Sequence, residues 1–237
     1  MADTPVSGTG ELYACGGSSP PFGILLTPGF QLMSQQGKVA VFISGRGSNL
    51  AALIRAQNKP EANFRIVLVV SDNPQAPGLA RAKKAGIKCH AWQRQDYFSR
   101  EEFEKGVLPL IKAEAVELIC LAGYMRLIGP LLLQKYAGRI MNIHPSLLPA
   151  FPGLKAQSKA LRHGVKYSGC TVHFVDAGLD SGPIIMQKPV AVHPDDNTEK
   201  LASRILRQEH RLFPAAVRLF FCKRLSVANG RVVIKEP

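Results

Sequence analysis

The sequence predicts an α/β protein with a single doubly wound, mostly parallel sheet, helices on both faces and a late antiparallel strand. From residue 38 onward, short apolar runs typical of buried strands alternate with helical segments, and this order is typical of parallel sheets. Later in the chain two β-rich runs are separated by a short connection, which favours antiparallel pairing. At 237 residues, 46% of them hydrophobic, the chain is long enough for a full core.

Residues 1–37 differ from the rest in composition, and we treat residues 38–237 as the predicted domain. The leader is rich in Gly, Ser, Pro and Thr and contains no basic residue, since the first basic residue of the chain is Lys38. Because such a segment cannot bury much apolar surface, we expect it to be poorly ordered. Signal and transit peptides need basic residues, so neither is predicted. Met33 offers an alternative start.

The first predicted unit is a strand, a glycine loop and a helix. Residues 38–43 form the strand, and the loop 44–49 (Ser-Gly-Arg-Gly-Ser-Asn) leads into a helix near residue 50. Its glycines permit positive φ, Ser48 or Asn49 can cap the helix, and exposed N–H groups there suit one phosphate. Residue 50 is Leu rather than the third glycine of a dinucleotide fingerprint. As a bare pattern, the loop can equally be a tight turn that holds no ligand.

The remaining elements follow from the same periodicities. Strands are predicted at 64–71, 87–91, 118–122, 139–144, 171–175 and 184–192, and helices at 78–85, 99–114, 154–164 and 197–221. Gly86 should end the second helix, and Ser99 with Glu102 forms a capping box at the start of the third. Pro214 should break the longest helix, and Asn229-Gly230 predicts a hairpin turn.

The strand that begins at residue 139 carries the first candidate catalytic residues. Alternation places Asn142 and His144 on one face, and Pro145 should end the strand because it has no N–H to donate. Ligands bind at the carboxyl ends of strands in open α/β sheets. An amide can donate to a developing oxyanion and an imidazole can titrate near neutral pH. Either residue alone is more often a structural polar group.

Charge and cysteine content narrow the ligand class. The net charge of +13, from 30 Lys and Arg against 17 Asp and Glu, favours an anionic ligand, with solubility as the plainer explanation. Basic residues are scattered, so we expect small anionic substrates and no nucleic-acid partner. Five cysteines without a Cys-x-x-Cys motif predict no metal site and fit reduced thiols in the cytoplasm. No apolar run approaches the roughly 18 residues needed to span a membrane.

Four motifs occur in the chain in a fixed order. They are Ser44-Gly-Arg-Gly-Ser-Asn49, Leu121-Ala-Gly-Tyr-Met-Arg126, Asn142-Ile-His-Pro-Ser-Leu-Leu-Pro149 and Leu179-Asp-Ser-Gly-Pro183. With them the chain resembles the folate-dependent formyltransferases over residues 38 to about 221, most closely the phosphoribosylglycinamide formyltransferases of purine synthesis. The resemblance implies the formyltransferase fold and transfer of a formyl group from 10-formyltetrahydrofolate to the amine of glycinamide ribonucleotide, without a metal. It implies no membrane partner and gives no oligomeric state.

The resemblance also assigns catalytic roles. Attack of the amine on the formyl carbon generates a tetrahedral oxyanion and requires proton transfer. Asn142 would donate to the oxyanion and His144 would manage the protons. Asp180 would pair with His144 directly or through water, and its negative charge would favour the imidazolium.

Binding roles are implied in the same way. Ribonucleotide contacts fall on Gly47, Ser48, Asn49, Gln208 and Glu209. Folate contacts fall on Arg100, Met125, Arg126, Leu127, Ile128, Asp176, Ala177, Gly178 and Leu179. Leu206 departs from the family, which often has Lys or Gln there for the phosphate, and Arg207 lies about 100° round the helix. Lys155 and Gln157 stand where many relatives carry His.

Three other functions compete with this one. Formyltetrahydrofolate deformylase has the same chemistry but adds an N-terminal regulatory domain, which 37 residues cannot build. Methionyl-tRNA formyltransferase adds a C-terminal barrel, whereas only a hairpin's length follows residue 221 here. The third is a catalytically silent phosphate- or folate-binding module. Formyl transfer assays with ribonucleotide, water and initiator tRNA as acceptors separate all of them.

Overall fold

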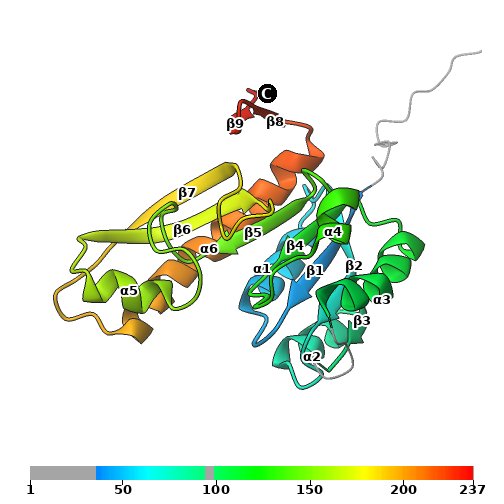
Figure 1. The fold of residues 1–237 in the computed structure, drawn as a ribbon, viewed down its shortest axis with the longest axis horizontal. Coiled ribbons are helices and arrows are strands. Elements are labelled where there is room, and N and C mark those ends of the chain that lie inside the picture. The colour runs from blue at the N-terminus through cyan, green and yellow to red at the C-terminus, as the bar shows by residue number, and fades with distance from the viewer. Residues whose placement is uncertain (1–35, 94–98, 237) are drawn as a thin grey trace, which may run out of the picture. The chain divides into compact units, whose positions relative to one another are not determined.

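The computed structural model describes residues 36–93 and 99–236 (Figure 1). The elements in chain order are β1 Gly37–Ile43, α1 Ser48–Gln57, β2 Phe64–Ser71, α2 Pro77–Lys84, β3 Lys88–Ala91, α3 Arg100–Ala113, β4 Leu118–Leu121, α4 Pro130–Lys135, β5 Ile140–His144, α5 Ala156–Arg162, β6 Tyr167–Phe174, β7 Ile184–Ala191, α6 Thr198–Phe221, β8 Leu225–Ala228 and β9 Arg231–Ile234. Almost all of the predicted leader lies outside the described residues, so its poor order stays a prediction.

Seven strands form one sheet in the order β3-β2-β1-β4-β5-β6-β7. The first five strands along the chain pair in parallel, β6 runs antiparallel to β5, and β7 runs antiparallel to β6. Within this sheet β6 is therefore the one strand of opposite direction, which confirms the predicted fold class. The chain builds outward from β1 to β3 and then returns to place β4 on the other side of β1. That reversal between β1 and β4 is the point where such sheets bind ligands.

Alternating side chains of β1 supply two hydrophobic cores, one on each face of the sheet. Val41 and Ile43 belong to the core that includes buried residues of α1, α2 and α6. Phe42 belongs to the other core, together with buried residues of α3 and α4. Helices thus cover both faces, as the near-continuous apolar strands require.

Helix ends agree with the sequence at two places and differ at one. Ser99 accepts a hydrogen bond from the Glu102 N–H, and Gly86 ends α2 at φ +69°, as predicted. Ser48 and Asn49 do not cap α1, because the N-cap is Gly47 and no side chain caps the helix there. Asn49 instead makes a buried hydrogen bond to a residue of α6, which takes its side chain away from the helix end.

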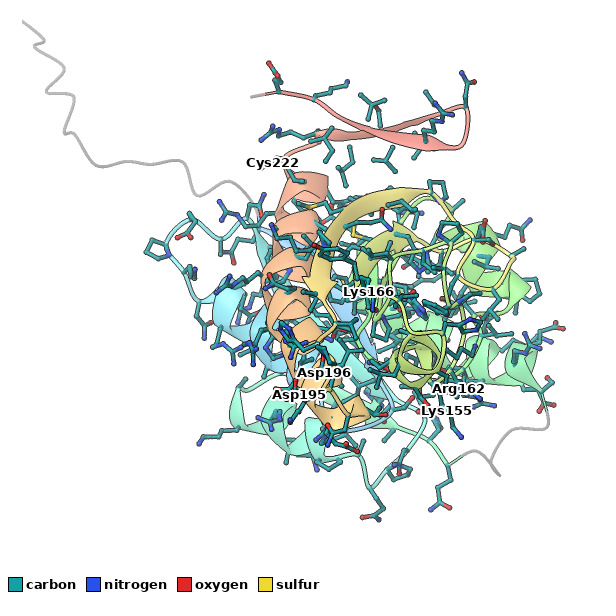
Figure 2. All side chains as sticks on the ribbon, turned by 90° about the vertical axis from the view of Figure 1, so that its left-hand side faces the viewer. Lys155, Arg162, Lys166, Asp195, Asp196 and Cys222 are labelled. Carbon is teal, nitrogen blue, oxygen red and sulfur yellow. The ribbon has the colours of Figure 1, made fainter. Side chains whose placement is uncertain are left out.

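The prediction that Pro214 breaks the longest helix is wrong. Helix α6 continues over 24 residues with Pro214 inside it. Phe213 and Val217 are fully buried beside it, so packing of the apolar face outweighs the loss of one backbone hydrogen bond. Figure 2 shows this helix running from Asp195 and Asp196 near its start to Cys222 at its end. The short helix α4 was not predicted, although Pro130 at its first position is a typical start signal.

None of the described helices is long and apolar enough to cross a membrane.

Candidate active site

The predicted site residues lie at the carboxyl ends of β1, β4 and β5, in the loop between β6 and β7, at the start of α3, and on helix α6. The loops after β1 and β4 are joined directly. The Ser44 N–H donates to the Gly123 carbonyl over 3.2 Å, and the Met125 N–H donates to the Ser44 hydroxyl over 2.9 Å. The glycine loop and the segment that begins at Met125 are therefore fixed side by side at the switch point of the sheet.

Asn142, His144 and Asp180 come together as predicted. Asp180 lies in the loop between β6 and β7, with its backbone at φ +53°. One of its carboxylate oxygens lies 3.2 Å from His144 Nδ1, and the other accepts from Asn142 Nδ2 over 3.3 Å. The side chains of His144 and Asp180 are 6% and 11% exposed. Asp180 thus contacts both His144 and Asn142 directly, so no bridging water is required.

The segment after β5 holds the second ring nitrogen of His144. Nε2 lies 2.9 Å from the carbonyl oxygen of Phe151, whose φ of +54° turns the backbone toward the ring. The Gly153 N–H donates to Asp180 over 2.8 Å and fixes the carboxylate. Both nitrogens of His144 therefore face hydrogen-bond acceptors, an arrangement that an imidazolium with two N–H groups satisfies.

His173 is a site residue that the sequence analysis did not single out. It stands on β6 directly opposite Asn142 of β5. Its Nδ1 lies 2.8 Å from the Phe174 carbonyl and must donate to it, so the neutral ring offers Nε2 as an acceptor to Asn142 Nδ2 at 3.1 Å. Burial lowers the pKa of His173 and favours that neutral ring, against opposing effects of Phe174 and Asp180. The four residues Asn142, His144, His173 and Asp180 are called the Asp180 cluster below.

The sequence did contain a signal for His173. It is a polar residue in the apolar strand that was predicted beside the Asn-x-His strand. What the sequence could not supply was the register, which places it opposite Asn142 rather than one residue away.

Of the residues predicted to bind the ribonucleotide, Asn49 and Glu209 are hydrogen-bonded to each other. Asn49 and Glu209 are buried, and Asn49 Nδ2 donates to the Glu209 carboxylate over 2.7 Å. Burial raises the pKa of Glu209, and the hydrogen bond from Asn49 opposes that effect. The Asn49 side-chain oxygen is also buried and has no hydrogen-bond partner among the described residues. Ser48 and Gln208 are half-buried.

The structure shows a packing reason for glycine at position 47 that the sequence did not reveal. Its φ is +67°, and a Cβ there would lie 2.7 Å from the Gly78 Cα at the start of α2. The close approach of these two backbones therefore requires glycine at position 47 with or without a phosphate. At Gly45 a Cβ would meet nothing within 4 Å.

The predicted folate residues divide into two groups. Arg100, Met125, Arg126 and Leu127 line a pocket of about 400 Å³ together with Asp72, which the sequence did not single out. We call it the Arg126 pocket. The guanidinium of Arg126 lies 5.5 Å from the centre of the Phe103 ring, and Ile128 packs against the core under α3 and α4. One carboxylate oxygen of Asp72 is buried without a hydrogen-bond partner among the described residues.

The second group, residues 176–179, is an exposed turn outside the described lining of the Arg126 pocket. Asp176 accepts from the Gly178 N–H and from the Ser181 hydroxyl, so its carboxylate shapes the turn that carries Asp180.

Positions that depart from the family pattern lie on the surface or near it. Leu206 and Gln157 are half-buried and Arg207 is exposed. Lys155, labelled in Figure 2, is exposed. Among the described residues, no group of three or more His, Cys, Asp and Glu side chains could hold a metal ion.

The fold and the site define an α/β protein with a cluster of Asn142, His144 and Asp180 at the carboxyl ends of the parallel strands of its sheet, in which His144 is buried and the other two are half-buried. The Formyl transferase family matches residues 37–217, and the chain belongs to this family. It is 45% identical over 181 residues to phosphoribosylglycinamide formyltransferase of Bacillus subtilis, covering 76% of this chain and 93% of the relative. It is 44% identical to the trifunctional purine biosynthetic protein adenosine-3 of Gallus gallus over 87% of this chain, but spans only 20% of that relative's length.

Solved structures give the same family. Glycinamide ribonucleotide transformylase 1 from Symbiobacterium toebii has a TM-score of 0.83 and 46% identity, covering 85% of this chain and 95% of that one. A formyltetrahydrofolate deformylase from Pseudomonas syringae has a TM-score of 0.80 at 27% identity, covering 86% of this chain and 67% of that one. The fold is therefore shared by an enzyme named as a transformylase and an enzyme named as a deformylase.

Proposed function

We propose that this chain transfers the formyl group of 10-formyltetrahydrofolate to the amine of glycinamide ribonucleotide in de novo purine synthesis. The observation that carries the proposal is the contact of Asp180 with both His144 and Asn142, which joins a proton carrier to an amide donor. Family members use a formyl folate as co-substrate. The high identity to a phosphoribosylglycinamide formyltransferase supports the ribonucleotide as acceptor. Small anionic substrates and a cytoplasmic location fit the charge of +13 and the cysteine pattern.

The reaction needs charge stabilisation and the movement of one proton. The ribonucleotide amine attacks the formyl carbon, and the carbonyl electron pair moves onto oxygen. Collapse of this tetrahedral oxyanion breaks the bond to the folate nitrogen. The attacking nitrogen gives up a proton and the leaving nitrogen gains one. His144 carries this proton, and Asp180 stabilises the imidazolium through its 3.2 Å contact.

Asn142 supplies a donor to the oxyanion. Its amide has two protons: one is accepted by His173 at 3.1 Å, and the other points to Asp180 at the longer distance of 3.3 Å. The oxyanion would replace Asp180 as the acceptor of the second proton. His173 holds the amide meanwhile, so the donor needs little reorganisation in the transition state.

The two substrates would bind next to each other at the loops that follow β1 and β4. The phosphate would bind at the N–H groups of the glycine loop, and Glu209 would accept the ribose hydroxyls. The Arg126 pocket would take the folate, with Arg100 and Arg126 facing its carboxylate tail.

A transfer assay with purified protein tests this proposal. We expect loss of formyl groups from 10-formyltetrahydrofolate to depend on glycinamide ribonucleotide and to yield one formylated ribonucleotide per folate consumed. Equal folate consumption in water without ribonucleotide would make the protein a deformylase, and transfer to initiator tRNA would make it a tRNA formyltransferase. Folate binding without turnover of any acceptor would identify a silent binding module.

A further inference from the structure

Helix α3 carries a buried carboxylate that the mechanism does not use. Glu104 is only 2% exposed. It accepts hydrogen bonds from the N–H groups of Gly129, Leu131 and Leu132, at 2.6, 3.1 and 3.3 Å. A buried carboxylate is costly unless it is well hydrogen-bonded, and here three backbone donors serve it. All three belong to the start of α4, some 25 residues further along the chain.

Glu104 takes the place of a side-chain cap for α4. The N-cap residue Gly129 has no side chain to offer, and Pro130 follows it at the first helical position. The free N–H groups at a helix start need acceptors, and a negative charge there is favourable. The fit is close, because a Cβ at Gly129 would lie 2.8 Å from a carboxylate oxygen of Glu104.

The same contact connects the two sides of the Arg126 pocket. Arg100, which lines the pocket, lies one turn before Glu104 on α3. Met125, Arg126 and Leu127 line it from the segment that ends at Gly129. Phe103, next to Glu104, contacts the guanidinium of Arg126. At the far end of this segment, the carboxylate of Glu104 fixes its backbone to α3.

We propose that Glu104 is a positioning residue for folate binding: by anchoring Gly129 and the start of α4, its carboxylate holds the 125–128 segment against Arg100. This inference rests on the proposed function, in which folate occupies the Arg126 pocket. Glu104 itself touches no substrate. Because Met125 and Leu127 are 63% and 51% exposed, the backbone of this segment has to supply the rigidity at these two positions. Ordering this segment before binding lowers the entropy lost on binding.

The variant Glu104→Gln tests the proposal with Glu101→Gln as a matched control. A Gln amide keeps one acceptor but turns an NH₂ group toward N–H donors, so one or two bonds are lost. We expect the KM for 10-formyltetrahydrofolate to rise about ten-fold, while kcat and the KM for ribonucleotide change by less than about two-fold. Glu101 lies on the same helix with an exposed side chain paired to Lys105, so its neutralisation should leave all three constants unchanged.

Gly129→Ala disturbs the same contact from the other side and should show the same split. If Glu104→Gln does not fold, Gly129→Ala alone tests whether the contact with Glu104 supports folate binding. Titration with tetrahydrofolate gives a second readout that is independent of catalysis, and both variants should bind it about ten-fold more weakly. If the wild type bound tetrahydrofolate but transferred no formyl group, the proposed function would fail while the titration still tested Glu104. Unchanged folate affinity in a folded variant would overturn the role, as would equal losses in kcat and in both KM values.

Discussion

In the Asp180 cluster each functional side chain is fixed by another side chain, whereas in the Arg126 pocket Met125 and Leu127 are exposed side chains on a segment that backbone hydrogen bonds fix at both ends. Asp180 contacts both Asn142 and His144, and His173 holds the other proton of the Asn142 amide. In the pocket, Met125 is fixed through its N–H to Ser44, and the segment ends at the backbone contact with Glu104.

The difference matches two different demands. A group that stabilises a transition state must be oriented before the reaction, because only interactions that strengthen in the transition state raise kcat. A pocket that binds a flexible co-substrate can use exposed side chains on a fixed backbone. Substitutions in the Asp180 cluster should therefore lower kcat, and substitutions around the pocket should raise a KM. The predictions below test that division from the largest expected effect to the smallest.

Asn142→Ala should have the largest effect of the single substitutions outside Asp180 and His144. Loss of a preorganised oxyanion donor costs about 10²- to 10³-fold in kcat, with both KM values little changed. Steady-state kinetics against each substrate measures this. A variant within about three-fold of wild type would remove Asn142 from the mechanism.

His173 should affect kcat through Asn142. His173→Leu removes the acceptor and should lower kcat about ten-fold, whereas His173→Gln keeps an oxygen near Nε2 and should lose less. Because burial lowers the pKa of His173, the ring stays neutral below the usual range for histidine near pH 6.5 and gains its proton only at lower pH. Protonation then ends acceptance from Asn142. The folded state loses stability as the pH falls from about 6.5, where the unfolded chain takes up this proton, to the lowered pKa of His173. The pH profile of kcat should lose this acid-side decline in His173→Gln, and a profile identical to wild type would contradict the assignment.

The glycine loop offers a matched pair of substitutions. Gly47→Ala places a Cβ 2.7 Å from Gly78 at a positive φ and should cost about 2 kcal/mol, or about 5 °C in Tm. Gly45→Ala meets nothing within 4 Å and should leave Tm unchanged. Thermal unfolding without ligand separates this packing requirement from phosphate binding. Equal Tm values for the two variants would show that the contact with Gly78 is unimportant.

Glu209 should make ribonucleotide binding pH-dependent. Its raised pKa means that the carboxylate takes up a proton at a higher pH than an ordinary glutamate near 4.3. As the pH falls through that raised pKa, the KM for ribonucleotide should rise a few-fold, because a protonated carboxyl accepts ribose hydroxyls less well. The KM for folate should not follow it, and Glu209→Gln should remove the dependence. A ribonucleotide KM that ignores pH in the wild type would exclude this role.

The sequence predicted the sheet well because strand periodicity is local, and it failed where distant residues decide. Period-two alternation was enough to place Asn142 and His144 on one face. Asp180 was assigned only through the family resemblance, since a loop carries no periodicity that shows where it folds back. His173 was missed because its role depends on the register between β5 and β6. The continuous α6 around Pro214 depends on tertiary packing of its apolar face.

Two further residues had explanations that local reasoning could not reach. The sequence pattern around Gly47 predicts a phosphate-binding loop, but the Gly47 Cα also packs against Gly78 of helix α2. Asn49 was a candidate helix cap from its sequence position, but its amide donates a hydrogen bond to Glu209, which lies 160 residues away in sequence. In both cases a residue type with a common local use serves a contact that only the folded chain creates.

The most direct test of the Asp180 cluster is a double-mutant cycle in kcat between Asp180→Asn and His144→Ala. Asp180→Asn removes the negative charge beside His144 and should lower kcat about 10²-fold or more, with small changes in either KM. If the two residues act as one unit through their 3.2 Å contact, the double variant should be scarcely slower than His144→Ala alone. Losses that multiply would contradict the cluster and leave Asp180 as a separate support for its turn.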